Sequence, residues 1–229
     1  MSAEELIAAL RAGVARGDGA GALSPLIDAL AAELAERRAM EARVRRSHEA
    51  MMRLARSAHI GEGRVPEALA EIATRAAEVL GVARSSIWTY DADQSAIHCI
   101  ELFVRDTGTH ESGVVLAASS YPAYFRALRE ERSIAASDAH TDPRTAEFSA
   151  GYLTPLGIGA MLDAPIRVGG RMIGVLCNEH VGQARSWSTD EEQLASSLAD
   201  FVALAIESGK RAEVEAQLRA VVAVLDESA

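Results

Sequence analysis

Residues 121–180 constrain the fold most strongly, because helix, strand and turn signals alternate there over short distances. An aromatic-bearing helix begins after Tyr121, with Ser119 or Ser120 expected as its cap and Pro122 in its first turn. A short strand over Ser133–Ser137 follows. The turn Thr141-Asp142-Pro143 then leads into a second short helix, which we expect over Arg144–Leu153.

The same stretch ends in a β-hairpin. Its strands are expected over Ile158–Val168 and Arg171–Val181, and Gly169-Gly170 suits a two-residue turn that needs positive φ. A long hairpin after short aromatic segments predicts a sheet with a roof over one face. Such a geometry builds a pocket, and this stretch contains no catalytic motif, which favours a sensor over an enzyme.

The flanking residues complete a layered domain. An amphipathic helix is expected from Val65 to Leu80, and Gly81 ends it. Three strands precede the roof, over residues 85–90, 96–104 and 114–117, with a polar loop over Asp106–Gly113. A last helix starts at the capping box formed by Ser188 and Glu191. We therefore expect an α+β fold, a six-stranded antiparallel sheet with helices on both faces.

Long helices are predicted to flank this domain at both ends. The glycines of residues 17–21 break the N-terminal helical segment, and Ser24 and Pro25 are expected to start the next helix. Apolar residues then recur at heptad gaps and predict a homodimer through a coiled coil or helical bundle; a single solvated helix is the alternative. The expected dimer residues are Leu26, Leu30, Val44, Met51 and Leu54, and in the last helix Val214, Leu218, Val221 and Leu225.

Charge and composition exclude several classes of function. The net charge of −10 argues against binding nucleic acid phosphates, and no apolar run approaches the length of a membrane span. The N-terminus lacks the apolar region of a secretory signal. Cys99 and Cys177 both lie in strand-like runs and are expected as buried core thiols rather than as a disulfide or zinc site. No metal site is expected, and a cytoplasmic location follows from this pattern.

The order of these segments resembles the GAF domain family, over about residues 65–208. The resemblance is carried by short motifs in a fixed order: Ser86-Ile87-Trp88, residues 121–125, Asp142-Pro143-Arg144, Tyr152-Leu153, residues 155–158, 162–166, 174–180 and 187–193. It is strongest to GAF sensor domains of bacterial histidine kinases and diguanylate cyclases. It implies a sensor domain over residues 61–208, between a helical segment over 1–60 and a signalling helix over 209–229.

The resemblance also implies a small ligand between the sheet and the roof. We expect Met161, Asp163, Cys177 and Glu179 on the ligand side of the last hairpin, with Leu162, Ile166 and Leu176 facing the long helices. Several of these residues have plain structural alternatives as core packing, helix capping or, for Glu179, a solvated strand end. The full set of candidate pocket residues is Trp88, Tyr121, Tyr124, Phe125, Asp138, Asp142, Phe148, Tyr152, Met161, Asp163, Cys177 and Glu179.

The identity of the ligand and of any cofactor stays open. Residues 141–156 contain no Cys, which disfavours a covalently bound bilin, and no His has a spacing that selects it for haem. A dimerisation and spacer scaffold that binds nothing is the main alternative, and a haem- or bilin-based photo- or redox sensor is less favoured. The chain is expected either to precede a kinase or cyclase output domain or to act as a stand-alone regulator. An enzyme on this scaffold is least favoured.

Overall fold

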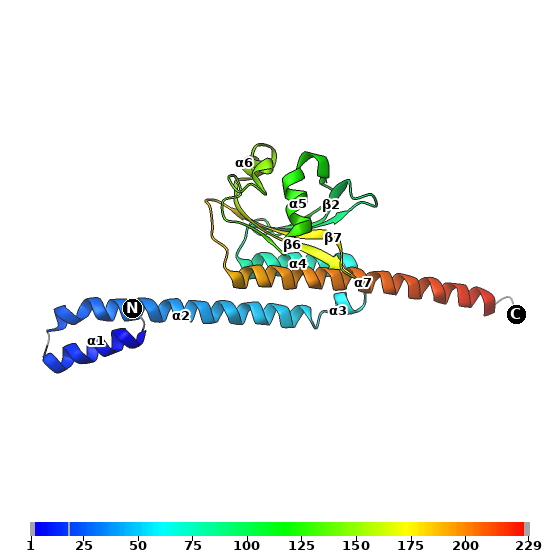
Figure 1. Ribbon diagram of the computed structural model, residues 1–229. Coiled ribbons are helices and arrows are strands. Elements are labelled where there is room, and N and C mark those ends of the chain that lie inside the picture. The colour runs from blue at the N-terminus through cyan, green and yellow to red at the C-terminus, as the bar shows by residue number, and fades with distance from the viewer. Residues whose placement is uncertain (1–2, 18, 227–229) are drawn as a thin grey trace. The chain divides into compact units, whose positions relative to one another are not determined.

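The computed structural model describes residues 3–17 and 19–226. The chain divides into two compact units, Met1–Glu49 and Ala50–Ala229. In the first unit, α1 (Ala3–Arg16) runs back along α2 (Ala20–Leu54), and the backbone N–H of Ala3 donates to Glu33 Oε1 at 2.5 Å (Figure 1). Leu6 of α1 is buried in this unit.

The start of α2 differs from the expected one. The helix begins at Ala20 and carries Pro25 inside it, so Ser24 and Pro25 are not its cap and first turn. Pro25 lacks a backbone N–H and therefore removes one bond of the second turn. Alanines before and after it are the best helix formers, and they extend the helix upstream of the proline.

The second unit contains one antiparallel sheet. Within the described residues seven strands form it, in the order β3-β2-β1-β7-β6-β5, with β4 also pairing with β2. The strands are β1 (Arg84–Tyr90), β2 (Ala96–Val104), β3 (Thr109–Glu111), β4 (Val115–Ala117), β5 (Ile134–Ala136), β6 (Ile158–Val168) and β7 (Arg171–Val181). The long central strands β1, β7 and β6 provide most of the floor on which the other elements pack.

The expected count of six strands is one too low. The additional strand is β3, which lies inside the segment expected as a polar loop and pairs with residues 102–104 of β2. All three of its residues are exposed, so no alternation of apolar and polar side chains marks it in the sequence. Its backbone pairing with β2, supported by the contact of the His110 ring with Glu101 and Phe103, makes it a strand.

One face of the sheet is covered by α4 (Val65–Leu80) and α7 (Thr189–Asp226), beneath the sheet in Figure 1. We call the buried layer between these two helices and the sheet the helix-side core. It includes Ile72, Leu80, Ile87, Leu162, Ile166, Leu176, Leu198 and Val202. The expected capping box is confirmed, because Ser188 N donates to Glu191 Oε2 at 2.9 Å and Glu191 N donates to Ser188 Oγ at 3.3 Å. Arg185 links the two helices, since its Nη2 donates to Leu80 O and to Glu191 Oε1.

The opposite face carries the roof, a series of short elements above the sheet in Figure 1. They are the 3-10 turn η1 (Ala118–Ser120), α5 (Pro122–Glu130), the 3-10 turn η2 (Ala146–Phe148), the π turn η3 (Ser149–Leu153) and α6 (Thr154–Leu156). The helix expected over Arg144–Leu153 is present only in irregular form: it begins at Ala146 and has 3-10 and π turns within the expected range. Gly151 and Pro155 are poor helix formers, and the chain passes through three different turns there.

The cap of α5 also differs from expectation. Ser119 and Ser120 lie in η1 and make no side-chain cap to the helix. The carboxylate of Glu147, from η2, accepts hydrogen bonds from Ala123 N at 3.0 Å and Tyr124 N at 3.4 Å instead. A negative side chain at a helix N-terminus is favourable both as an acceptor and toward the helix dipole. One roof element thus fixes the orientation of another.

The short helix α3 (Ala58–Gly61) connects α2 to α4, and residues before it belong to the larger unit. Leu54, expected on a dimer seam, is fully buried in the helix-side core, so it faces its own domain rather than a partner. Met51 packs against the same core. The helices α2 and α7 have 35 and 38 residues, but no helix in the described part of the chain is apolar enough to cross a membrane.

Gly209 sets how closely α7 approaches the start of α4. A Cβ at this position would lie 2.2 Å from Val65 Cγ2, whereas a Cβ at Gly61, also helical, would meet nothing within 4 Å. We expect Gly209→Ala to unfold more easily than Gly61→Ala, by about 1–3 kcal/mol, because overpacking forces Val65 to move. Urea unfolding of both variants measures this difference. Equal midpoints would show that the contact between α4 and α7 is not tight.

Candidate functional site

The two faces of the β6–β7 hairpin divide the side chains as expected. Leu162, Ile166 and Leu176 lie in the helix-side core. Met161, Asp163, Cys177 and Glu179 lie on the roof side, where Asp163 is paired in register with Cys177 and Met161 with Glu179. The predicted assignment of sheet faces is confirmed, and two carboxylates are thereby placed beneath the roof.

Asp163 is fully buried and held by the roof. The Tyr124 hydroxyl of α5 donates to Asp163 Oδ2 at 2.6 Å and lies 3.5 Å from Cys177 Sγ. Asp163 Oδ1 is buried and has no hydrogen-bond partner among the described residues. Burial raises the pKa of Asp163 to about 7, partly opposed by the Tyr124 hydrogen bond. Burial therefore favours the protonated form of this carboxyl below about pH 7.

Glu179 is the second buried carboxylate, with 1% of its surface exposed. Its Oε1 accepts from the Tyr152 hydroxyl at 2.7 Å, and its Oε2 accepts from Arg84 Nε at 2.8 Å. The solvated alternative for this residue is therefore wrong. Burial raises the pKa of Glu179, and the charge of Arg84 and the Tyr152 hydrogen bond oppose that rise. A buried ion pair of this kind is costly to break, because one partner would remain charged and unpaired.

The roof aromatics fill most of the space above these carboxylates. Tyr121 stacks on Phe148 with ring centroids 4.1 Å apart, and Tyr124 meets the Phe148 ring edge-on at 4.8 Å. The cavity that remains has a volume of about 10 Å³ and is lined by Trp88, Tyr152, Met161 and Cys177 among others. This volume suits about one water molecule. A larger ligand therefore requires the roof to move.

The other predicted pocket residues have structural roles. Trp88 and Phe125 belong to the buried layer under the roof, and Trp88 Nε1 donates to Ser86 Oγ at 2.8 Å. Asp138 Oδ1 accepts from His140 N at 3.1 Å in the turn before η2. Asp142 accepts from Arg144 N and pairs with the Arg144 guanidinium, which lowers the Asp142 pKa. The structure does not bring Asp138 or Asp142 to the cavity. Tyr121, Phe125 and Asp163 do not line it either, although all three lie in or against the layer beneath the roof.

Two contacts around the candidate site are missing from the prediction. Arg84 pairs with Glu179 because the two residues are opposite each other in the register of β1 and β7. Glu147 caps α5 across the roof. Both contacts join residues far apart in the chain, and no local pattern marks either of them. The strand register is the signal that would have identified Arg84.

Cys99 and Cys177 are both buried and free, as expected. Burial raises the pKa of Cys99 to about 11 and that of Cys177 well above its usual range. Both thiols are therefore protonated at neutral pH and are poor nucleophiles. Their positions on β2 and β7 provide packing and, for Cys177, a contact with the Tyr124 hydroxyl.

Comparisons with known proteins agree with this geometry. The GAF domain family matches residues 64–206. The GAF domain of an Acinetobacter phosphoenolpyruvate-protein phosphotransferase is similar in structure, with 16% identity, TM-score 0.56, and coverage of 73% of this chain and 94% of that one. A bacteriophytochrome from R. palustris has 19% identity and TM-score 0.62, covering 80% of this chain and 40% of that one.

A free methionine-R-sulfoxide reductase from Neisseria meningitidis, solved with its substrate, is also similar in structure. It has 14% identity and TM-score 0.52, covering 72% of this chain and 89% of that one. No curated protein sequence matches the chain. At these identities the structural likeness shows a shared fold.

The raised pKa of Asp163 predicts a pH dependence of stability. The folded state keeps this proton up to about pH 7, while the unfolded chain loses it near pH 4, so the carboxyl's contribution falls as pH rises between these values. We expect Asp163→Asn to lose this dependence, which amounts to about 1.4 kcal/mol per pH unit at most. Urea unfolding between pH 4 and 7 measures it, with the exposed Asp200→Asn as the control for loss of one carboxylate. Parallel pH profiles of wild type and Asp163→Asn would contradict the prediction.

Proposed function

The chain belongs to the GAF domain family, and on that premise we propose that it is a sensory module that binds a small ligand between sheet and roof. The single observation that carries the proposal is the unpartnered Oδ1 of Asp163, buried beneath the roof. An unsatisfied buried carboxylate oxygen costs free energy that a hydrogen-bond donor would recover. The ligand expected here carries an amine, amide or hydroxyl group toward Asp163.

Entry of this ligand depends on the roof side chains. Tyr152 is half-buried and lies on the π turn η3, a short irregular segment without the regular bonding of an α-helix. Its hydroxyl occupies Glu179 Oε1, a position that a ligand donor group can take over. Displacement of Tyr152 would enlarge the cavity from its present size while leaving the Arg84–Glu179 pair intact. Binding would then select a rearranged roof over the closed one.

The proposed relay runs through α7 and a second copy of the chain. Beyond Gly209 this helix exposes apolar residues at heptad gaps: Val214 (63%), Leu218 (63%), Val221 (57%) and Leu225 (63%). A long apolar row on one helix face is unusual in a monomer and fits a two-stranded coiled coil. In α2, Val44 is exposed while Leu26 and Leu30 are half-buried. The dimer proposal therefore rests mainly on α7, with Val44 as the candidate in α2.

The nearly filled space under the roof favours a second candidate function. If the aromatic roof never opens, the domain acts as a dimerisation and spacer element. A covalent bilin is not proposed, although a bacteriophytochrome shares the fold, because residues 141–156 contain no cysteine. A kinase or cyclase output domain remains the proposed partner of either candidate.

A thermal-shift screen with small amines, amides and polyols tests ligand binding. A ligand at about 100 times its Kd stabilises the folded state by about 2.7 kcal/mol, which raises Tm by several degrees. We expect this shift in wild type and in Asp200→Asn, and its loss in Asp163→Asn. The sensor proposal fails if no compound moves Tm and hydrogen exchange protects the Tyr124 amide as strongly as those of β7.

Paired substitutions on α7 test the dimer. Val214→Asp with Val221→Asp places charges on the apolar row, whereas Ala216→Asp with Ala220→Asp adds the same charge to the opposite helix face. Light scattering should show a dimer for wild type and for the alanine pair, and a monomer for the valine pair. All four positions and their sequence neighbours are solvent-exposed in one copy, so folding should survive. A dimeric valine pair would show that α7 is not the interface.

A further inference from the structure

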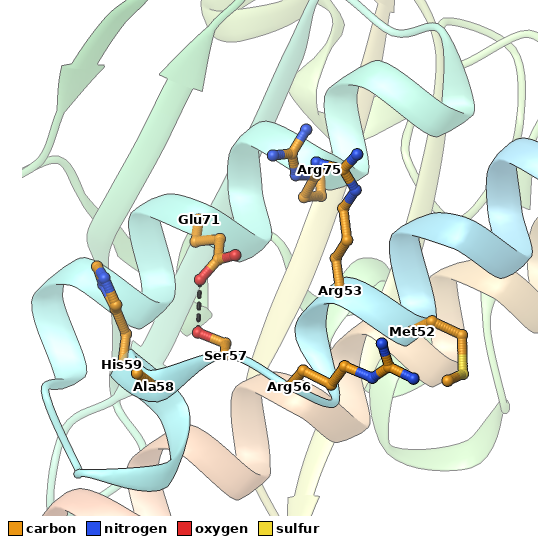
Figure 2. Close-up of a pocket in the computed structure, with 8 residues that line it drawn as sticks. All are labelled: Met52, Arg53, Arg56, Ser57, Ala58, His59, Glu71 and Arg75. Atoms are coloured by element: carbon orange, nitrogen blue, oxygen red, sulfur yellow. Dashed lines mark hydrogen bonds between the residues drawn. The ribbon is translucent and has the colours of Figure 1, made fainter.

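A second concave site lies on the helix side of the domain, away from the roof. It is formed where the last turn of α2, the link to α3 and the middle of α4 meet, and its volume is about 540 Å³ (Figure 2). This is within the range of small-molecule sites. The GAF roof does not contribute to it, so its occupant would be independent of the ligand proposed above.

Three arginines line this groove, which we call the arginine groove: Arg53 on α2, Arg56 on the link and Arg75 on α4. Figure 2 shows Arg53 extending from α2 toward Arg75 on α4. Arg53 and Arg56 are exposed, and neither guanidinium has a carboxylate or hydrogen-bond partner in the part of the chain that the structure describes. In a chain with net charge −10, such a cluster is a local site of attraction for anions.

Two buried nitrogen atoms beside the groove lack a hydrogen-bond partner among the described residues. Arg75 Nη1 pairs with Glu78 Oε2 at 2.7 Å, but Arg75 Nε is buried without an acceptor among the described residues. The ring nitrogen Nδ1 of His59, on the same groove, is likewise buried and unpartnered within residues 3–17 and 19–226. The buried N–H of Arg75 Nε, left without an acceptor, costs free energy that a bound anion would recover, and His59 Nδ1 can add a second donor when the ring is protonated there.

A single carboxylate, Glu71, lies among the described residues that line the arginine groove, and it is already engaged. The Ser57 hydroxyl donates to Glu71 Oε2 at 2.6 Å, as the dashed line in Figure 2 marks. Glu71 does not form an ion pair with any of the three guanidinium groups within the described residues. The groove therefore keeps an excess of positive charge in the folded chain.

We propose that the arginine groove binds a phosphate-bearing small molecule. One guanidinium fork can satisfy the two oxygens of a carboxylate, whereas guanidinium groups from three positions suit the larger number of oxygens and the double charge of a phosphate. Arg53 and Arg56 come from the end of α2 and its link, and Arg75 comes from α4. A phosphate bound by all three joins these segments and fixes the last turn of α2 against the domain.

Calorimetry of the full chain with inorganic pyrophosphate tests the site, with malonate at the same ionic strength as the carboxylate arm. We expect saturable binding of pyrophosphate and at least tenfold weaker binding of malonate. Arg53→Gln with Arg56→Gln should weaken pyrophosphate binding about tenfold or more, because two charge-assisted contacts are lost. Glu71→Gln should strengthen it, since a repelling charge leaves the groove. Circular dichroism checks that each variant is folded.

Two control variants make the outcome decisive. Arg45→Gln with Arg46→Gln removes the same two charges from exposed positions of α2 outside the groove and should leave pyrophosphate affinity unchanged. Asp163→Asn should also bind normally, which separates this site from the roof. The proposal is overturned if pyrophosphate does not bind, if malonate binds as tightly, or if both arginine pairs lower the affinity equally, which would indicate general electrostatic attraction.

Discussion

The burial of Asp163 and Glu179 beneath the roof is the constraint on which the rest of the domain depends. A carboxylate removed from water is costly unless it is paired or hydrogen-bonded. Tyr124, Tyr152 and Arg84 bond three of the four carboxylate oxygens, at distances of 2.6, 2.7 and 2.8 Å, and Asp163 Oδ1 has no partner among the described residues. Each partner comes from a different element, so these contacts hold α5, η3 and β1 at fixed positions over the hairpin. The roof is thereby tied to the sheet by polar bonds as well as by aromatic packing.

The helix side of the sheet is held in a different way. There the layer is apolar, and α4 and α7 are joined at one end by Arg185 and brought close at the other by Gly209. Because α7 is one continuous helix, its exposed heptad row is a direct extension of the helix that packs on the sheet. If a change in the roof shifted the sheet, α7 would therefore transmit the shift directly to its exposed apolar residues, with no flexible link between them. This arrangement is the physical basis of the relay proposed for the module.

Much of the fold was predictable because its signals are local. The alternation along Ile158–Val168 and Arg171–Val181 separates the two faces of the sheet, and the pattern of α4 identifies the side that packs. β3 was missed because its residues are all exposed and carry no alternation. The spacing of Phe148 and Tyr152 predicts one regular helix, whereas the two residues lie on successive turns of different type. Heptad spacing predicts Leu54 on a dimer seam, but such spacing does not specify which partner an apolar face meets, and Leu54 packs in its own domain.

The sequence by itself determined the family, most of the order of elements and which side chains of β6 and β7 face the roof, because periodicity and turn residues act over a few positions. Only the tertiary structure decided that Tyr124 and Tyr152 bond the two carboxylates, that Arg84 lies opposite Glu179, and that Asp138 and Asp142 stay in their turn. The arginine groove is likewise a product of folding, since α2 and α4 bring Arg53 and Arg75 to one surface. Contacts between residues far apart in the chain depend on register and packing, which no local pattern encodes.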